Sequence, residues 1–178
     1  MLNIIFEFLK KLFKFSTDTA AENSLQNNNA PKANQGISYS KQLIPTLQHE
    51  HQELVYLYGQ IGDALYVKNY LTIDKILEKL KVEFSKHIMQ ENVSFYCYIE
   101  QELSNNPHRM ELIRNYRKEM NSISHAFVKF IKKWQNTLIT EETVTEFRSE
   151  YDAIGAVLAQ RINSEEEHLY PLYQPSAV

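Results

Sequence analysis

Glycine, proline and cysteine are scarce in this sequence, and each scarcity narrows the range of folds. Only 4 Gly and 5 Pro occur in 178 residues, whereas 43% of the residues are hydrophobic. Long helices therefore fit better than many short strands separated by turns, and we predict an all-α protein. A single cysteine, Cys97, excludes an intrachain disulfide and a cysteine-rich structural zinc site, and it fits a reducing compartment such as the cytoplasm. The length is sufficient for one domain with a sizeable core.

A strong excess of charge of either sign is also missing. The 19 basic and 22 acidic residues give a net charge of -3, which creates no field that would attract nucleic acid. The sequence also has neither a glycine-rich phosphate loop nor a nucleophile paired with a general base. We therefore expect no nucleic-acid partner, and we favour a binding or sensing protein over an enzyme.

The chain divides into an apolar N-terminal segment, a polar linker, a helical domain and a short tail. Residues 1–15 are apolar except for a narrow stripe that includes Lys10 and Lys14, which predicts an amphipathic helix. The segment is too short to span a bilayer, so we expect an anchor on an anionic membrane surface, at the inner face of the membrane. The alternative is that this helix packs on the bundle or on a partner protein. Residues 16–40 predict a disordered linker, 41–174 the domain and 175–178 a tail.

Four amphipathic helices are predicted between residues 41 and 174. The apolar stripe of the first helix alternates spacings of four and three, and comprises Leu47, His51, Leu54, Tyr58, Ile61 and Leu65. The other helices are predicted at about 72–103, 106–137 and 140–171, the last beginning near Thr140 or Thr143. Because the connections are short, sequential helices should be antiparallel, which gives an up-down-up-down four-helix bundle.

An internal repeat of 74 residues relates the two halves of the predicted bundle. Each half has a histidine on its first helix and, 36 residues later, the pattern X-Ile-x-x-Glu followed by a tyrosine. The shift superimposes His51 on His125, His87 on Arg161, Ile88 on Ile162, Glu91 on Glu165 and Tyr96 on Tyr170.

The repeated polar residues predict a shared metal site. His87 and Glu91 are four residues apart, so they project from one helix face and can bind one ion. Antiparallel pairing brings His51 and His125 towards the same region from the other helices. Imidazole and carboxylate groups on an apolar stripe are costly to bury unless they are paired or bind a metal. We therefore expect these side chains to converge inside the bundle.

These residues resemble the hemerythrin-like (HHE cation-binding) family over about residues 41–174. The resemblance rests on Glu50-His51, on the string His-Ile-Met-Gln-Glu at 87–91, on His125, and on residues 161–171. The last string is similar to the family's His-Ile-x-x-Glu-Glu-x-x-Leu-Tyr-Pro ending, except at its first residue. Membership implies a non-haem iron site, commonly with two irons held by several histidines and bridged by two carboxylates. The metal ligands implied here are His51, His87, Glu91, His125 and Glu165, with iron as the metal and zinc or manganese as alternatives.

Arg161 departs from this pattern, because a guanidinium has only donors and cannot ligate a cation. Three outcomes remain open. In the first outcome, the site lacks one histidine but still holds one iron or zinc ion through three histidines and one or two carboxylates. Alternatively, His168 compensates, since 161, 165 and 168 share a helix face. In the third outcome, Arg161 forms a buried ion pair with Glu91 or Glu165, and the bundle is a metal-free module. Tyr58, one heptad after His51, is a further candidate for lining the pocket.

The resemblance also implies a class of function. Our leading interpretation is a non-haem iron protein that binds or senses dioxygen, nitric oxide or iron. The first alternative is an enzyme that handles iron, repairs iron-sulphur centres or reduces peroxide. The second alternative is a metal-free bundle that acts as an interaction module. The sequence does not indicate the oligomeric state of the protein.

Overall fold

All regular secondary structure in residues 36–176, which the computed structural model describes, is helical. The four long helices are α2 (Leu43–Tyr66), α3 (Tyr70–Gln90), α5 (Pro107–Gln135) and α6 (Val144–Ser164). The π-helix η2 (Glu91–Tyr96) and the short helix α4 (Cys97–Glu102) continue α3. The π-helix η3 (Glu165–Leu169) and the 3-10 helix η4 (Tyr170–Leu172) continue α6. The prediction of an all-α domain with four main helices is confirmed.

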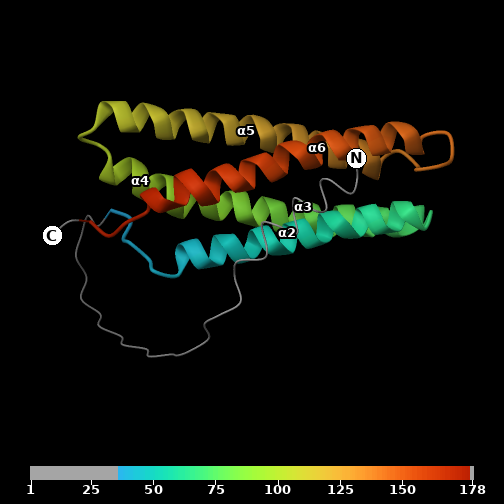
Figure 1. Cartoon of the computed structure of the whole chain (residues 1–178), viewed down its shortest axis with the longest axis horizontal. Coiled ribbons are helices and arrows are strands. Elements are labelled where there is room, and N and C mark those ends of the chain that lie inside the picture. The colour runs from blue at the N-terminus through green and yellow to red at the C-terminus, as the bar shows by residue number, and fades with distance from the viewer. Residues whose placement is uncertain (1–35, 177–178) are drawn as a thin grey trace, which may run out of the picture.

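The long helices lie side by side along most of their length (Figure 1). Helix α2 packs against α3, α3 against α5, and α5 against α6. The α2–α3 turn and the α5–α6 connection lie at one end of the bundle, and the α4–α5 connection lies at the other (Figure 1). No helix in this part of the chain is both long enough and apolar enough to cross a membrane. The predicted helix at 1–15 and most of the predicted linker lie outside the described residues.

Local signals fix the ends of the helices in the second half of the domain. Asn106 caps α5, because its side-chain Oδ1 accepts a hydrogen bond of 3.1 Å from the backbone N–H of Arg109, and Pro107 is the first helical residue. Helix α6 begins directly after Thr143, the second of the two starts that the sequence allows. The Thr143 hydroxyl closes the preceding loop instead of capping the helix, because it donates to the carbonyl of Leu138 at 2.8 Å.

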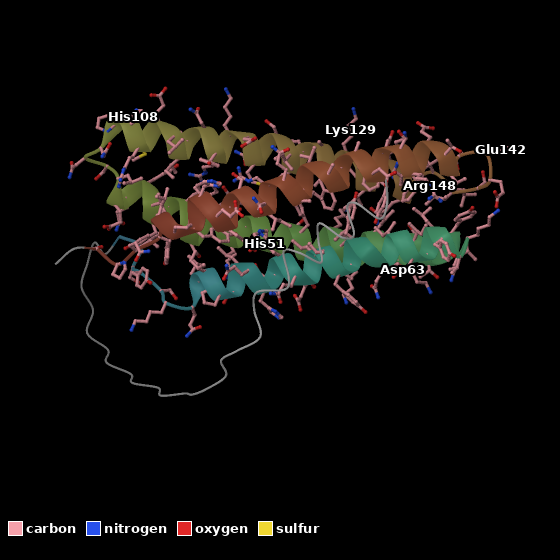
Figure 2. All side chains as sticks on the ribbon, in the orientation of Figure 1. His51, Asp63, His108, Lys129, Glu142 and Arg148 are labelled. Atoms are coloured by element: carbon pink, nitrogen blue, oxygen red, sulfur yellow. The ribbon has the colours of Figure 1, made fainter. Side chains whose placement is uncertain are left out.

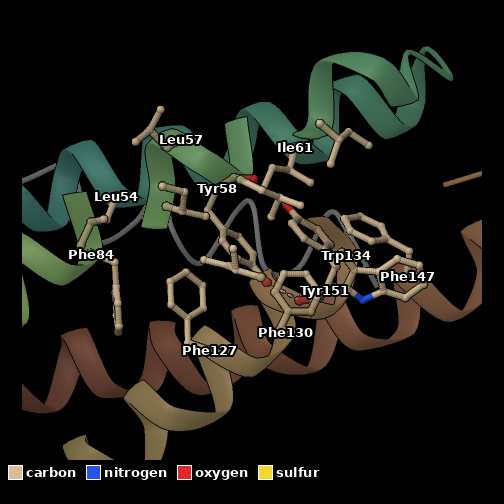
Figure 3. Close-up of a cluster of buried hydrophobic side chains, with 14 of the residues drawn as sticks. Leu54, Leu57, Tyr58, Ile61, Phe84, Phe127, Phe130, Trp134, Phe147 and Tyr151 are labelled. Carbon is tan, nitrogen blue, oxygen red and sulfur yellow. Dashed lines mark hydrogen bonds between the residues drawn. The ribbon is translucent and has the colours of Figure 1, made fainter. Parts of the chain in front are cut away.

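The core consists of two apolar clusters separated by a polar layer. The larger cluster lies towards the α2–α3 turn and contains aromatic side chains from all four long helices, including Tyr58, Phe84, Phe127, Phe147 and Tyr151 (Figure 3). The smaller cluster lies towards the C-terminal end of the domain and includes Leu47, Phe95, Tyr96, Leu169 and Tyr170. Along α2 the change from one cluster to the other occurs between Leu47 and Leu54, where His51 is buried.

Two tyrosines connect α2 to α6 just beside this polar layer. The Tyr58 hydroxyl donates to the backbone carbonyl of Tyr151 at 2.6 Å, and the Tyr151 hydroxyl donates to that of Tyr58 at 2.9 Å. The two rings stack with centroids 4.5 Å apart (Figure 3). Gly155 makes this close packing possible, because a Cβ atom there would lie 2.8 Å from Cε1 of Tyr58. The pair holds α2 and α6 in a fixed relative position next to the site.

Candidate metal centre

The polar layer consists of five buried side chains contributed by three helical segments and their extensions. His51 comes from α2, His87 from the end of α3, Glu91 from the start of η2, Arg161 from the end of α6 and Glu165 from the start of η3. Each of the five is only 1% to 4% exposed. Both glutamates are the first residue of a π-helix, a local departure from α-helical geometry that is frequent at functional sites. At these two glutamates, the two halves of the domain are therefore alike in backbone conformation as well as in sequence.

The two histidines lie close together, and one carboxylate reaches towards them. The rings of His51 and His87 have centroids 4.7 Å apart. Nε2 of His51 lies 3.3 Å from Oε2 of Glu165. His51 is placed along the length of the bundle rather than at one of its ends (Figure 2). The ligand atoms of His51, His87 and Glu165 all lie within 4.8 Å of one another.

Each imidazole also contacts a further carboxylate through its Nδ1 atom. Nδ1 of His87 lies 3.1 Å from Oε2 of Glu50, and Nδ1 of His51 lies 2.9 Å from Oε1 of Glu166. The hydrogen bond from His87 lowers the pKa of Glu50, so this carboxylate is ionised and can only accept. Nδ1 of His87 is therefore the protonated nitrogen, and its Nε2 keeps a free lone pair. Carboxylates that accept from one nitrogen of an imidazole are the usual partners of metal-ligating histidines.

The two rings differ in protonation when no metal is bound. Burial lowers the pKa of His87 below its ordinary value, although the hydrogen bond to Glu50 opposes the shift. Burial also disfavours the charged form of His51, but hydrogen bonds to Glu165 and Glu166 outweigh it and raise the pKa of His51 to about 9. His87 is thus neutral, the form that binds metals, whereas His51 carries a proton that a metal would displace.

Glu91 has one oxygen with a partner and one without. Oε1 accepts a hydrogen bond of 3.2 Å from the hydroxyl of Tyr170, which also lies 3.3 Å from Nε2 of His51. Oε2 is buried and has no hydrogen-bond partner within residues 36–176. Burial and the nearby charge of Glu165 raise the pKa of Glu91 well above its ordinary value. An unsatisfied buried oxygen is costly, and a bound cation would satisfy it.

Arg161 occupies the other side of Glu165. Its Nε donates to Oε1 of Glu165 at 2.5 Å, its Nη2 donates to the Tyr96 hydroxyl at 2.8 Å, and its Nη1 donates to Oε2 of Glu119 at 3.2 Å. Burial would raise the pKa of Glu165, but the hydrogen bond from His51 and the charge of Arg161 hold it below its ordinary value. The buried ion pair that the sequence left open therefore forms with Glu165.

A family model matches the helical domain. The model of the hemerythrin HHE cation binding domain matches residues 42–173, which include every member of the polar layer. The chain belongs to the hemerythrin HHE cation-binding domain family. Neither the curated proteins nor the solved structures contain a match to this chain. Membership implies a metal cofactor, typically iron, and the donor set fits one: two imidazoles, the Glu165 carboxylate and the unpartnered oxygen of Glu91.

One of the ligands that the hemerythrin resemblance implied, His125, does not reach this group. His125 is exposed, and its Nδ1 lies 2.6 Å from the carbonyl of Asn121 on its own helix. The buried face of α5 contains Phe127, which lies two residues further on and therefore about 200° around the helix. Lys129, one turn after His125, lies on the outer side of α5 (Figure 2). The prediction that His125 points inward is wrong.

His168 and Tyr58 also lie elsewhere than in the polar layer. His168 is exposed, whereas Leu169, four residues after Glu165, is buried and shares its helix face. The prediction that His168 compensates for Arg161 is therefore wrong. Tyr58 does line the pocket beside the site, as predicted, but its hydroxyl is bonded to the backbone of Tyr151.

Four residues that contact the site were not predicted as part of it: Glu50, Glu166, Tyr96 and Tyr170. Glu50 precedes His51 in sequence but contacts His87 of a different helix, and no pattern along one helix reveals such a pair. The tyrosines could have been found, because the 74-residue shift superimposes Tyr96 on Tyr170 just as it superimposes the two glutamates.

A small apolar cavity adjoins the histidines. Its volume is about 50 Å³, and His51, His87, Arg161 and Glu165 form its polar side. Most of the apolar walls come from the larger core cluster, including Leu54, Phe84, Phe127 and Leu158. Ala159 of α6 completes them. A space of this size holds only a very small molecule, because a cavity that binds benzene has about 150 Å³.

Proposed function

We propose that this hemerythrin-domain protein binds iron through His51, His87 and Glu165, with Glu91 as a further carboxylate ligand. We also propose that the adjoining cavity would admit dioxygen or nitric oxide to an ion held by these residues. One observation carries the proposal: each imidazole is held at Nδ1 by a carboxylate, so that Nε2 is left for a metal. This arrangement orients the rings and raises their basicity as ligands, which a purely structural pair of histidines would not need.

The donor set favours a transition metal over a hard cation. Two imidazoles and one carboxylate with open positions are characteristic of non-haem ferrous sites, although zinc and manganese accept similar donors. Ferrous iron supplies a redox-active centre that can take a neutral diatomic molecule. The chain's own residues would hold the ion, exclude bulk water and leave room for a ligand of about the size of the cavity.

The cavity favours a small neutral ligand. Its walls are apolar side chains from α2, α3, α5 and α6, which give no binding energy to an anion or a large polar substrate. The exception is Arg161, whose guanidinium lies at the polar side of the cavity. These apolar walls support a binding or sensing function more than an enzymatic one. Catalytic consumption of peroxide by the purified protein would test the enzymatic alternative.

A metal-free module is the second candidate, and one observation favours it. Arg161 already gives Glu165 a charged partner at 2.5 Å, so this carboxylate is satisfied without any cation. The unpartnered oxygen of Glu91 argues against this candidate, because nothing in the described part of the chain satisfies it.

Metal analysis separates these candidates. We expect protein from iron-supplemented cells to contain iron and to show an optical spectrum, and we expect His51→Ala and His87→Ala each to lose most of the metal. His125→Ala is the matched control, because this histidine lies on the outer face and should leave the metal content unchanged. Iron-free wild-type protein, or equal loss in all three variants, would contradict the proposal.

We also propose that residues 1–15 attach the domain to the inner surface of the cytoplasmic membrane. The support is the sequence alone, in which lysines accompany Leu, Ile and Phe. Co-sedimentation of the full chain with anionic vesicles tests it, with Lys10, Lys11 and Lys14 all changed to Glu as the comparison. Sedimentation of neither protein would rule the attachment out, and equal sedimentation of both would rule out a contribution from the lysines.

A further inference from the structure

Glu165 lies between two different positive groups. Its Oε2 faces Nε2 of His51 at 3.3 Å, whereas its Oε1 accepts from Nε of Arg161 at 2.5 Å. One carboxylate thus joins a histidine side of the polar layer to an arginine side. A carboxylate that bridges two metal ions divides its oxygens in the same way.

The arginine side contains no imidazole within the described part of the chain. Every nitrogen of the Arg161 guanidinium has an oxygen partner, namely Glu165, the Tyr96 hydroxyl and Glu119. The face of the Tyr116 ring covers the same group, with its centroid 5.4 Å from Cζ. The repeat would have placed a second histidine pair here, but His125 points out of the bundle and Arg161 stands in place of the other histidine.

The charge and shape of Arg161 exclude a second cation from this position. Arg161 is only 4% exposed and is permanently charged, so a metal ion beside it would meet a like charge that bulk water does not screen. The guanidinium also donates to the oxygens that a second ion would need as ligands. It neutralises Glu165 as an ion would, and it does so as part of the chain.

We propose that Arg161 takes the place of a second metal ion, so that this site holds one ion and not two. The inference rests on the proposed iron site, and it identifies Arg161 as the residue that sets the metal stoichiometry. The histidine side, with His51, His87 and Oε2 of Glu165, is the single binding position.

Anaerobic titration of the full chain with Co²⁺, followed by its visible absorption and by calorimetry, tests the inference. We expect saturation at one equivalent for the wild type and for Arg161→Lys, which keeps the positive charge. Arg161→His removes the fixed charge and restores an imidazole, and we expect it to bind a second equivalent.

Each other result has a definite meaning. Two equivalents in the wild type would overturn the inference while leaving the metal site intact. One equivalent in Arg161→His would show that Arg161 does not set the number of ions. If the wild type binds no metal, the proposed function itself fails. Should Arg161→His fail to fold, as a thermal melt would reveal, the wild-type stoichiometry alone still decides between one ion and two.

Discussion

Glu50 of α2 holds the ring of His87 on α3, because Nδ1 of the imidazole donates to Oε2 of the carboxylate at 3.1 Å. Both side chains are buried, and the pair joins two helices directly behind the proposed ligand nitrogen. Without Glu50 the ring would be free to rotate, and Nε2 would no longer be directed at Glu165.

We therefore predict that Glu50→Gln binds metal about 10–100-fold more weakly than the wild type, the usual effect of removing such a partner. Competition with a coloured chelator measures the affinity. Glu53→Gln is the control, because Glu53 lies on the same helix but is half exposed and pairs with the exposed His49. Similar affinities for the two variants would argue that Glu50 does not orient His87.

The second prediction concerns pH. The pKa of His51 in the metal-free protein is raised to about 9 from an ordinary value of 6.5, since its carboxylate partners outweigh the effect of burial. The protonated ring therefore stabilises the metal-free fold fully below about pH 6.5, and this stabilisation is lost as the pH rises through about 9. A metal must displace the same proton, so metal affinity should increase over this range.

Thermal melts of the metal-free and Co²⁺-loaded proteins across this range test the pH prediction. We expect the metal-free Tm to fall and the gain in Tm on adding metal to grow. Glu166→Gln removes one carboxylate partner of His51 and should weaken both trends, whereas Glu167→Gln, at an exposed position, should not. A gain that is constant with pH would show that His51 is not protonated in the metal-free state.

The third prediction concerns the tyrosine pair between α2 and α6. Tyr58→Phe removes the hydrogen bond to the Tyr151 carbonyl and should lower the free energy of unfolding by about 1 kcal/mol. Gly155→Ala places a Cβ atom 2.8 Å from the Tyr58 ring and should cost about 1–3 kcal/mol through overpacking. Gly59→Ala is the control, since a Cβ atom there meets nothing within 4 Å and should stabilise α2 by roughly 0.5–1 kcal/mol. Urea denaturation measures all three, and destabilisation by Gly59→Ala would disagree with this packing.

The fourth prediction concerns the cavity. Ala159→Leu adds apolar atoms to a buried wall and should fill most of the space beside the histidines. Packing a ligand against this side chain costs about 1–3 kcal/mol, so we expect roughly 10–100-fold weaker binding of nitric oxide to the ferrous protein at unchanged iron content. Ala156→Leu, on the exposed face of the same helix, is the control. Titration by absorbance measures both, and unchanged affinity in Ala159→Leu would place the ligand elsewhere.

The sequence was sufficient to predict the helices and four members of the polar layer. His87 and Glu91 are four residues apart, and Glu165 occupies the matching place in the second half, so helical periodicity alone puts these side chains on inward faces. The repeat did not predict the direction of His125. The buried residue on this part of α5 is Phe127, and two residues correspond to about 200° around a helix, so His125 lies on the outer side.

The sequence by itself determined which residues share a helix face, since that depends only on spacings within one continuous helix. Only the tertiary structure decided that Glu50 supports His87, that Glu166 supports His51, and that Arg161 reaches Tyr96 and Glu119. These pairings depend on how each helix is rotated and shifted against its neighbours, and the packing of the two apolar clusters sets that rotation for the whole bundle.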